Sequence, residues 1–178
     1  LDKFWEQSVS CALLCKHLAD ELGVKESEKL FVCGLLHNIG ELVMVQLDPK
    51  IAKDNASISQ EITPLMLQNK NLGFSYAKVS SGLLSHWGIP DDISQIRAKI
   101  HVSEGEAQTK EQQIIQLAYI LARNNVNREF YSIDNELSPE VYQVLGLELD
   151  SVNNALDFCN LQLISALALF SPSSFAMY

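Results

Sequence analysis

The sequence predicts an all-α fold, and three observations carry this prediction. Apolar residues recur at helical spacing in long segments, as in 2–22 and 110–125, which indicates helices with one buried face. No stretch of useful length alternates between apolar and polar residues, as a half-buried strand would. Of the 178 residues, 47% are hydrophobic, which is enough to bury a full core. We therefore expect a folded helical domain.

Glycine and proline divide the first half of the chain into helices. A helix over 2–22 ends at Gly23, because glycine readily adopts the left-handed conformation that closes a helix. A second helix over 26–38 has acidic residues in its first turn, where the helix dipole favours negative charge. Further helical segments are predicted over 42–47, 50–56 and 58–70.

The middle of the chain follows the same rules. A helix over 76–87 stops at Gly88. Pro90 opens the next helix, because the fixed φ of proline suits the first helical position. That helix runs to about His101, and the polar residues 102–109 read as a loop.

Two long helices and a short one are predicted for the last third. The helix over 110–125 has a clear apolar face, made by Ile114, Leu117, Ala118, Leu121 and Ala122. A short helix begins after Ser138, has Pro139 at its first position and ends near Gly146. The helix over 151–170 is expected to turn inward Val152, Leu156, Cys159, Leu163 and Leu167.

The segment 31–42 combines an apolar composition with a polar pair, His37-Asn38. Burying such a pair is costly unless it is hydrogen-bonded, so we expect His37 to bond Asn38 or a neighbouring helix. Gly34 lacks a side chain and would let another helix come close. Gly40 is expected to kink or end the helix, since glycine weakens a helix interior.

The charge balance excludes some partners. The formal net charge is −9, which disfavours non-specific nucleic-acid binding, because that requires a basic face. No signal peptide is visible. The apolar run 161–170 is shorter than the ~20 residues that span a bilayer, so no membrane partner is predicted.

The cysteines suggest a reducing compartment. Cys11, Cys15, Cys33 and Cys159 form no C-x-x-C pair, and we expect them to be buried free thiols of a cytoplasmic protein. A metal site made by Cys11, Cys15 and His17 is disfavoured, because His17 points off the face that the two cysteines share and no fourth ligand is suggested.

Four segments together resemble the HDOD domains, a bacterial signalling branch of the HD superfamily of metal-dependent phosphohydrolases. The segments are 4–9, 31–42, 76–90 and 96–101. They are similar, in order, to the aromatic-Trp opening, the Gly-Leu-Leu-His segment, the Gly-x-Leu-Leu…Trp-x-x-Pro segment and the segment ending in a double histidine. The resemblance covers roughly residues 4–150. It implies one HD-like helical bundle over 1–178, as the C-terminal part of a longer HDOD module or chain.

The resemblance also implies where metal ligands would lie, and this chain departs from them. Gln7 and Tyr76 stand where the family has histidines, and Asn38 and Tyr119 stand where it has aspartates. His37 matches the family. His101 matches the first histidine of the pair, while valine replaces the second. No carboxylate is left at these positions, and hard divalent ions require carboxylate oxygens.

We therefore expect a non-catalytic regulatory domain of HDOD type, without a cofactor, that binds a protein partner or a small ligand. The residues expected to converge on a relict pocket are Gln7, His37, Asn38, Tyr76, His101 and Tyr119. The alternative is a metal-dependent phosphohydrolase with a divalent ion at His37 and His101, in which the metal would activate a water molecule.

Overall fold

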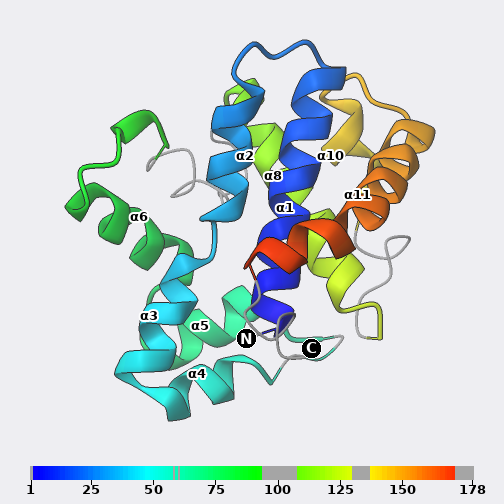
Figure 1. Cartoon of the computed structure of the whole chain (residues 1–178). Coiled ribbons are helices and arrows are strands. Elements are labelled where there is room, and N and C mark those ends of the chain that lie inside the picture. Colours follow the sequence, from blue (N-terminus) through cyan, green and yellow to red (C-terminus); the bar gives the residue numbers. More distant parts are fainter. Residues whose placement is uncertain (1, 58, 60, 94–107, 130–136, 171–178) are drawn as a thin grey trace.

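The computed structural model is helical throughout the residues that it describes, which are 2–57, 59, 61–93, 108–129 and 137–170. No strand occurs among them, and the predicted all-α class is confirmed. The helices, labelled in Figure 1, are α1 (Asp2–Glu21), α2 (Ser27–Leu35), α3 (Ile39–Leu47), α4 (Pro49–Asn55), α5 (Pro64–Leu72), α6 (Tyr76–His86), α8 (Lys110–Val126), α10 (Pro139–Gln143) and α11 (Leu149–Phe170).

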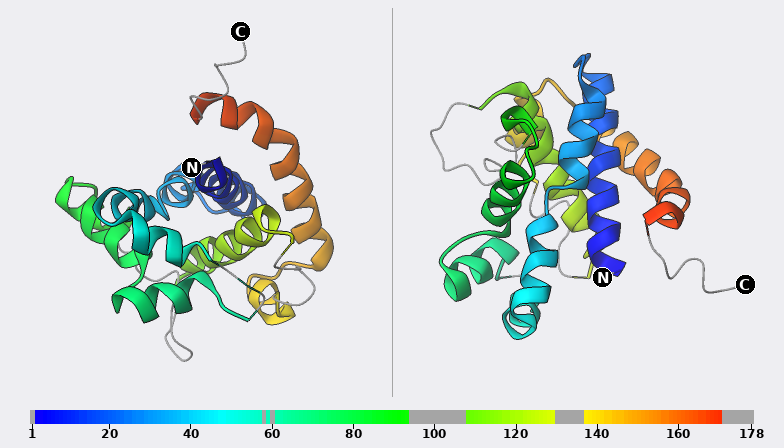
Figure 2. Two further views of the ribbon diagram at one scale, coloured as in Figure 1. Left: turned by 90° about the horizontal axis from the view of Figure 1, so that it is seen from below. Right: turned by 60° about the vertical axis from the view of Figure 1, so that its left-hand side comes forward.

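The helices form two groups, and α1 lies at the centre of the first. In the first group α1 packs against α2, α8 and α11, and α10 bridges α8 and α11. In the second group α3 packs against α6 and α4, and α4 packs against α5. Figures 1 and 2 show the second group on one side of α1 and α11 on the other. The short turn between α2 and α3 joins the groups.

The first group holds the main core. The predicted face of the 110–125 helix is fully buried in α8, because it meets the apolar face of α1. All four cysteines are buried free thiols within the first group, as predicted. In α11, Val152, Leu156 and Cys159 are buried. Leu163 and Leu167, predicted to point inward, are only half-buried, because the last turns of α11 stand apart from the other helices, as both views of Figure 2 show.

The helix predicted over 26–38 ends three residues earlier in the structure. Helix α2 ends at Leu35, residues 36–38 form a turn, and α3 starts at Ile39. The backbone N–H of Leu36 donates to the carbonyl of Val32, and the N–H of His37 donates to the carbonyl of Gly34, three residues earlier. This shorter bond tightens the chain where α2 ends. His37 and Asn38 therefore lie in the turn between the two groups rather than inside a helix.

Gly34 and Gly40, on either side of this turn, let helices come into close contact. A Cβ atom on Gly34 would lie 2.8 Å from the Cα of Ala12, so α1 and α2 touch through their backbones, as predicted. A Cβ atom on Gly40 would lie 2.9 Å from the Cβ of Val79 in α6. Gly40 is therefore a packing position inside α3, and its predicted role as a kink or end is wrong. Its N–H also donates to Ser80 Oγ at 2.8 Å.

Two other boundaries differ from the predictions. Helix α5 begins at Pro64 rather than residue 58, because Thr63 Oγ1 accepts from the N–H of Met66 and caps it. Asp48 caps α4 in the same way, with its Oδ1 accepting from the N–H of Ile51. The helix predicted over 90–101 lies outside the described residues beyond Ile93.

The segment Ser27–Leu47 has the length and apolar composition of a membrane span. In the structure it comprises α2, the turn and α3, and its two glycines pack directly against α1 and α6. Such packing is typical of a core element of a folded domain.

The contact at Gly40 predicts a specific loss of stability. Gly40→Ala should lower the free energy of unfolding by roughly 1–3 kcal/mol, because the new methyl group would force α3 away from α6. Gly82→Ala is the matched control, since Gly82 lies in α6 with no atom within 4 Å of an added Cβ. It should stabilise the protein by about 0.5–1 kcal/mol. Urea unfolding of both variants measures the difference, and equal effects would contradict the close approach.

Candidate functional site

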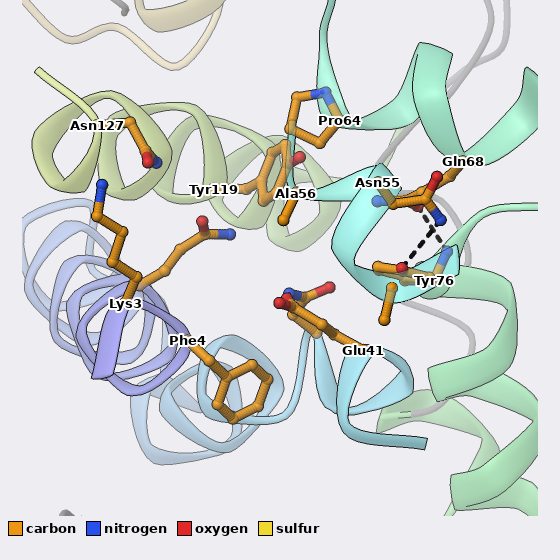
Figure 3. Close-up of a pocket in the computed structure, with 13 residues that line it drawn as sticks. Lys3, Phe4, Glu41, Asn55, Ala56, Pro64, Gln68, Tyr76, Tyr119 and Asn127 are labelled. Carbon is orange, nitrogen blue, oxygen red and sulfur yellow. Dashed lines mark hydrogen bonds between the residues drawn. The ribbon is translucent and has the colours of Figure 1, made fainter. Parts of the chain in front are cut away.

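A cavity of about 140 Å³ lies between the two groups of helices. Figure 3 shows side chains entering it from α1, α3, α4, α5, α6 and α8. It is lined by Lys3, Phe4, Gln7, Asn38, Glu41, Ala52, Asn55, Ala56, Pro64, Gln68, Tyr76, Tyr119 and Asn127. Amides and phenols make up most of the polar groups of this lining, and Glu41 is its one carboxylate among the described residues.

The structure brings together most of the residues expected in a relict pocket. Gln7, Asn38, Tyr76 and Tyr119 all line the cavity. His37 lies directly behind it, with its ring edge-on to Tyr119 at a centroid distance of 5.6 Å. The sixth expected residue, His101, lies outside the described residues.

His37 is buried and has a partner at each ring nitrogen. Nδ1 lies 2.6 Å from the carbonyl oxygen of Gly34, and Nε2 lies 3.1 Å from Nε2 of Gln7. In a neutral ring with the proton on Nδ1, the ring donates to Gly34 and accepts from Gln7. The expected bond to a neighbouring helix is therefore present, through Gln7 of α1, while Asn38 bonds elsewhere. The turn explains this, because it directs the two consecutive side chains apart.

The surroundings of His37 shift its pKa in opposite directions. Burial opposes protonation of the ring. Cys11, the Gly34 carbonyl and Glu41 favour the protonated form, and together they raise the pKa of His37 above its ordinary value.

Asn38 bonds Glu41, a pocket residue that the resemblance to HDOD domains does not identify. The Nδ2 group of Asn38 donates to Oε2 of Glu41, one helical turn further on. Glu41 is partly buried, and burial raises its pKa although Asn38 and His37 act in the opposite direction. The signal was present in the sequence, because a glutamate four residues after His37 lies within one turn of the polar pair. Glu41 does not stand at a position where the resemblance implies a metal ligand.

A chain of amides fixes Tyr76 on the opposite wall. Its hydroxyl accepts from Nδ2 of Asn55 at 3.0 Å, and Oδ1 of Asn55 accepts from Asn71 at 2.7 Å. The backbone N–H of Tyr76 donates to Oε1 of Gln68 at 2.7 Å. Figure 3 marks the two bonds that Tyr76 makes with Asn55 and Gln68. Burial raises the pKa of the Tyr76 phenol, so its hydroxyl stays protonated and can donate to an occupant of the cavity.

Tyr119 and Lys3 mark the side of the pocket formed by α8 and α1. The guanidinium carbon of Arg123 lies 5.7 Å from the Tyr119 ring centroid. Burial raises the pKa of Tyr119, while Arg123 partly opposes the shift. Lys3 Nζ pairs with Glu129 at 3.2 Å, and both side chains are well exposed.

The donor set does not fit a hard divalent ion. Among the described residues, no three His, Cys, Asp or Glu side chains converge as a metal site would require. Both ring nitrogens of His37 are already hydrogen-bonded, and one carboxylate offers little charge to offset a divalent cation. Elsewhere, His17 stacks on Phe158 at a centroid distance of 4.7 Å, so its ring packs against an aromatic side chain of α11.

The raised pKa of Glu41 predicts that its charge lowers stability. Between the ordinary value of 4.5 and the raised folded value, the folded state binds more protons than the unfolded state. The free energy of unfolding therefore falls as pH rises through that window and stays low above it. Glu41→Gln removes the charge and keeps an acceptor for Asn38. It should raise the free energy of unfolding at pH 7 by about 0.5–2 kcal/mol, the usual range for a single stabilising substitution.

The check is urea unfolding of wild type and Glu41→Gln at pH 7 and pH 4. The gain should shrink at pH 4, where wild-type Glu41 is protonated. Both proteins keep the neighbouring titratable groups His37, Tyr76 and Tyr119, so the difference between them reports the charge of Glu41 together with its effect on the pKa of these neighbours. An equal difference at both pH values would contradict the assignment.

Solved structures of bacterial proteins share this fold. A "putative signal transduction protein" from Marinobacter aquaeolei superposes with a TM-score of 0.73 at 21% identity, covering 93% of this chain and 38% of that one. An HDOD domain protein of unknown function from Geobacter sulfurreducens gives 0.68 at 19% identity, covering 94% and 62%. A "putative phosphohydrolase" from Shewanella amazonensis gives 0.67 at 22% identity, covering 92% and 61%. This chain thus spans less than two thirds of each of these proteins.

Sequence comparison identifies the family. An uncharacterised protein of Treponema pallidum is 28% identical over 82 residues, which cover 45% of this chain and 15% of that protein. The profile of the HDOD domain matches residues 1–103, a span that includes α1 to α6 and therefore most of the pocket. The chain belongs to the HDOD domain family.

Proposed function

We propose that this chain is a non-catalytic signal-transduction domain that binds a small ligand in the cavity between its two groups of helices and acts through a partner protein. The observation that carries the proposal is the lining of the cavity, whose polar groups are mostly amides and phenols. Four of them, Gln7, Asn38, Tyr76 and Tyr119, stand at positions where the resemblance to HDOD domains implies metal ligands. A concave site with a few converging polar groups is the usual form of a small-molecule site.

The position of the cavity supports a signalling role. Its lining comes from α1 and α8 of the first group and from α3 to α6 of the second. An occupant therefore contacts both groups, and one that binds one arrangement of the groups more tightly shifts the population toward it. A partner protein that contacts either group could detect this shift.

The cellular location and the kind of partner are also part of the proposal. We infer a bacterial cytoplasmic protein, supported by the buried free thiols and by the bacterial origin of the relatives. The net charge of −9 disfavours nucleic acid as the partner. The single domain over 1–178, as part of a longer chain, stays a prediction.

Metal-dependent phosphohydrolysis is the second candidate function. It is favoured by the name of the Shewanella relative and by the carboxylate of Glu41 near His37, two groups of the types that bind metals. It is weakened by the hydrogen bonds that occupy both His37 ring nitrogens, because a metal would have to displace one of these partners.

Hydrolysis assays with added metal and thermal melts with a chelator distinguish the two candidate functions. We predict that the protein does not hydrolyse p-nitrophenyl phosphate or bis(p-nitrophenyl) phosphate with added Mg²⁺ or Mn²⁺, and that Asn38→Asp alone does not create activity. A chelator should leave the melting temperature unchanged, because an ion that bound only the folded state would stabilise it. Turnover that disappears in His37→Ala, or a chelator-induced drop of several degrees, would establish the hydrolase instead.

Filling the cavity tests ligand binding. Ala52 lines the cavity, and Ala52→Trp should block it. Backbone amide shifts can be recorded while fragments of five to ten non-hydrogen atoms, both charged and neutral, are added. We expect fragments that shift amides near Gln7, Tyr76 and Tyr119 in wild type but not in Ala52→Trp. Ala168→Trp, at an exposed position of α11, is the control and should keep this binding. If no fragment shifts these amides, the cavity is not a ligand site.

A further inference from the structure

Glu41 forms no ion pair in the part of the chain that the structure describes, although the nearby His37 favours its charged form. The ion pairs of the described residues do not include it. Its hydrogen bond from Asn38 engages Oε2 only. The nearby imidazole of His37 points its nitrogens at Gly34 and Gln7. The second carboxylate oxygen of Glu41 is therefore available to a donor that enters the cavity.

Aromatic rings surround the same space. Phe4, Tyr76 and Tyr119 all line the cavity, and in Figure 3 Glu41 lies between Phe4 and Tyr119. The face of an aromatic ring attracts a cation within about 6 Å of its centroid. A carboxylate among aromatic rings is the combination that recognises an ammonium group, since the rings attract the charge and the carboxylate accepts its hydrogen bonds.

The size of the cavity limits the ligand. Its volume of about 140 Å³ is close to that of cavities that hold benzene, roughly 150 Å³, so about six non-hydrogen atoms fit. Lys3 is the one basic residue of the described lining. It lies away from Glu41 in Figure 3, and it already pairs with Glu129. The negative net charge of the chain further favours a cation over an anion.

We propose that the cavity binds a small organic cation, a protonated primary amine of about five to seven non-hydrogen atoms, whose ammonium group donates to Glu41. This inference rests on the proposed ligand-binding function and specifies its ligand class. The carbon chain of the amine lies between Phe4 and Tyr119. A carboxylate at the far end of the ligand would lie toward Lys3, so a free amine and an amino acid share the same recognition at Glu41.

The test compares n-butylammonium with 1-butanol, a neutral molecule of the same size, by amide-shift titration of the full chain. We expect the ammonium ion to bind at least about tenfold more tightly, as charge-assisted hydrogen bonds do. Glu41→Gln should weaken n-butylammonium at least about tenfold and change 1-butanol less than about twofold. Glu41→Asp, which keeps the charge, should retain a preference for the ammonium ion.

Glu111→Gln is the matched control. Glu111 is also partly buried and also lies in the first turn of a helix, but it does not line the cavity. This variant removes the same charge and should leave both affinities within about twofold of wild type. Titration of wild type and Lys3→Met with γ-aminobutyrate then distinguishes an amino acid from a simple amine. The affinity for γ-aminobutyrate depends on Lys3 only if the carboxylate of the ligand is bound there.

Three results would overturn the inference. Equal binding of 1-butanol and n-butylammonium, or unchanged n-butylammonium binding in Glu41→Gln, would refute the cation site while leaving the cavity as a ligand site. Equal losses in Glu41→Gln and Glu111→Gln would show a general charge effect. If neither these probes nor any other fragment shifted the cavity amides, the proposed function itself would fail.

Discussion

The close approach of helices at Gly34 and Gly40 is the constraint on which the rest of the structure depends. At Gly34 the backbones of α1 and α2 touch, and at Gly40 α3 packs against α6 in the same way. Only a few residues separate the two contacts, so the intervening turn is held from both ends. Any larger side chain at either position would separate the helices and displace the turn.

The fixed turn decides what its polar residues do. His37 is directed into the protein, where it is buried and bonds Gln7 and Gly34, while Asn38 is directed to the cavity, where it bonds Glu41. Each of these two polar side chains thus has a partner, which is the condition for keeping it inside an apolar domain. Amides and phenols from both groups of helices line the cavity that this turn borders.

Glu41 shows how stability and binding can conflict in such a cavity. Its partial burial disfavours the charged carboxylate and so lowers the stability of the folded state at neutral pH. Groups with a shifted pKa are enriched at functional sites. The amide network around Tyr76 has the opposite property, because its polar groups are hydrogen-bonded to one another.

The sequence by itself determined the helical class, most helix positions, the buried face of α8 and the close contact at Gly34, because these depend on local periodicity and on residue size. The motifs that resemble HDOD domains also identified Gln7, Asn38, Tyr76 and Tyr119, which the structure brings to one cavity. Only the tertiary structure decided that α2 ends before His37, that Gly40 packs on α6 and that Glu41 enters the cavity. The spacing of Glu41 from His37 and Asn38 is visible in the sequence, but the face that Glu41 turns to the cavity and the packing of Gly40 on α6 depend on contacts between segments far apart in the chain. Neither helical periodicity nor a motif contains that information.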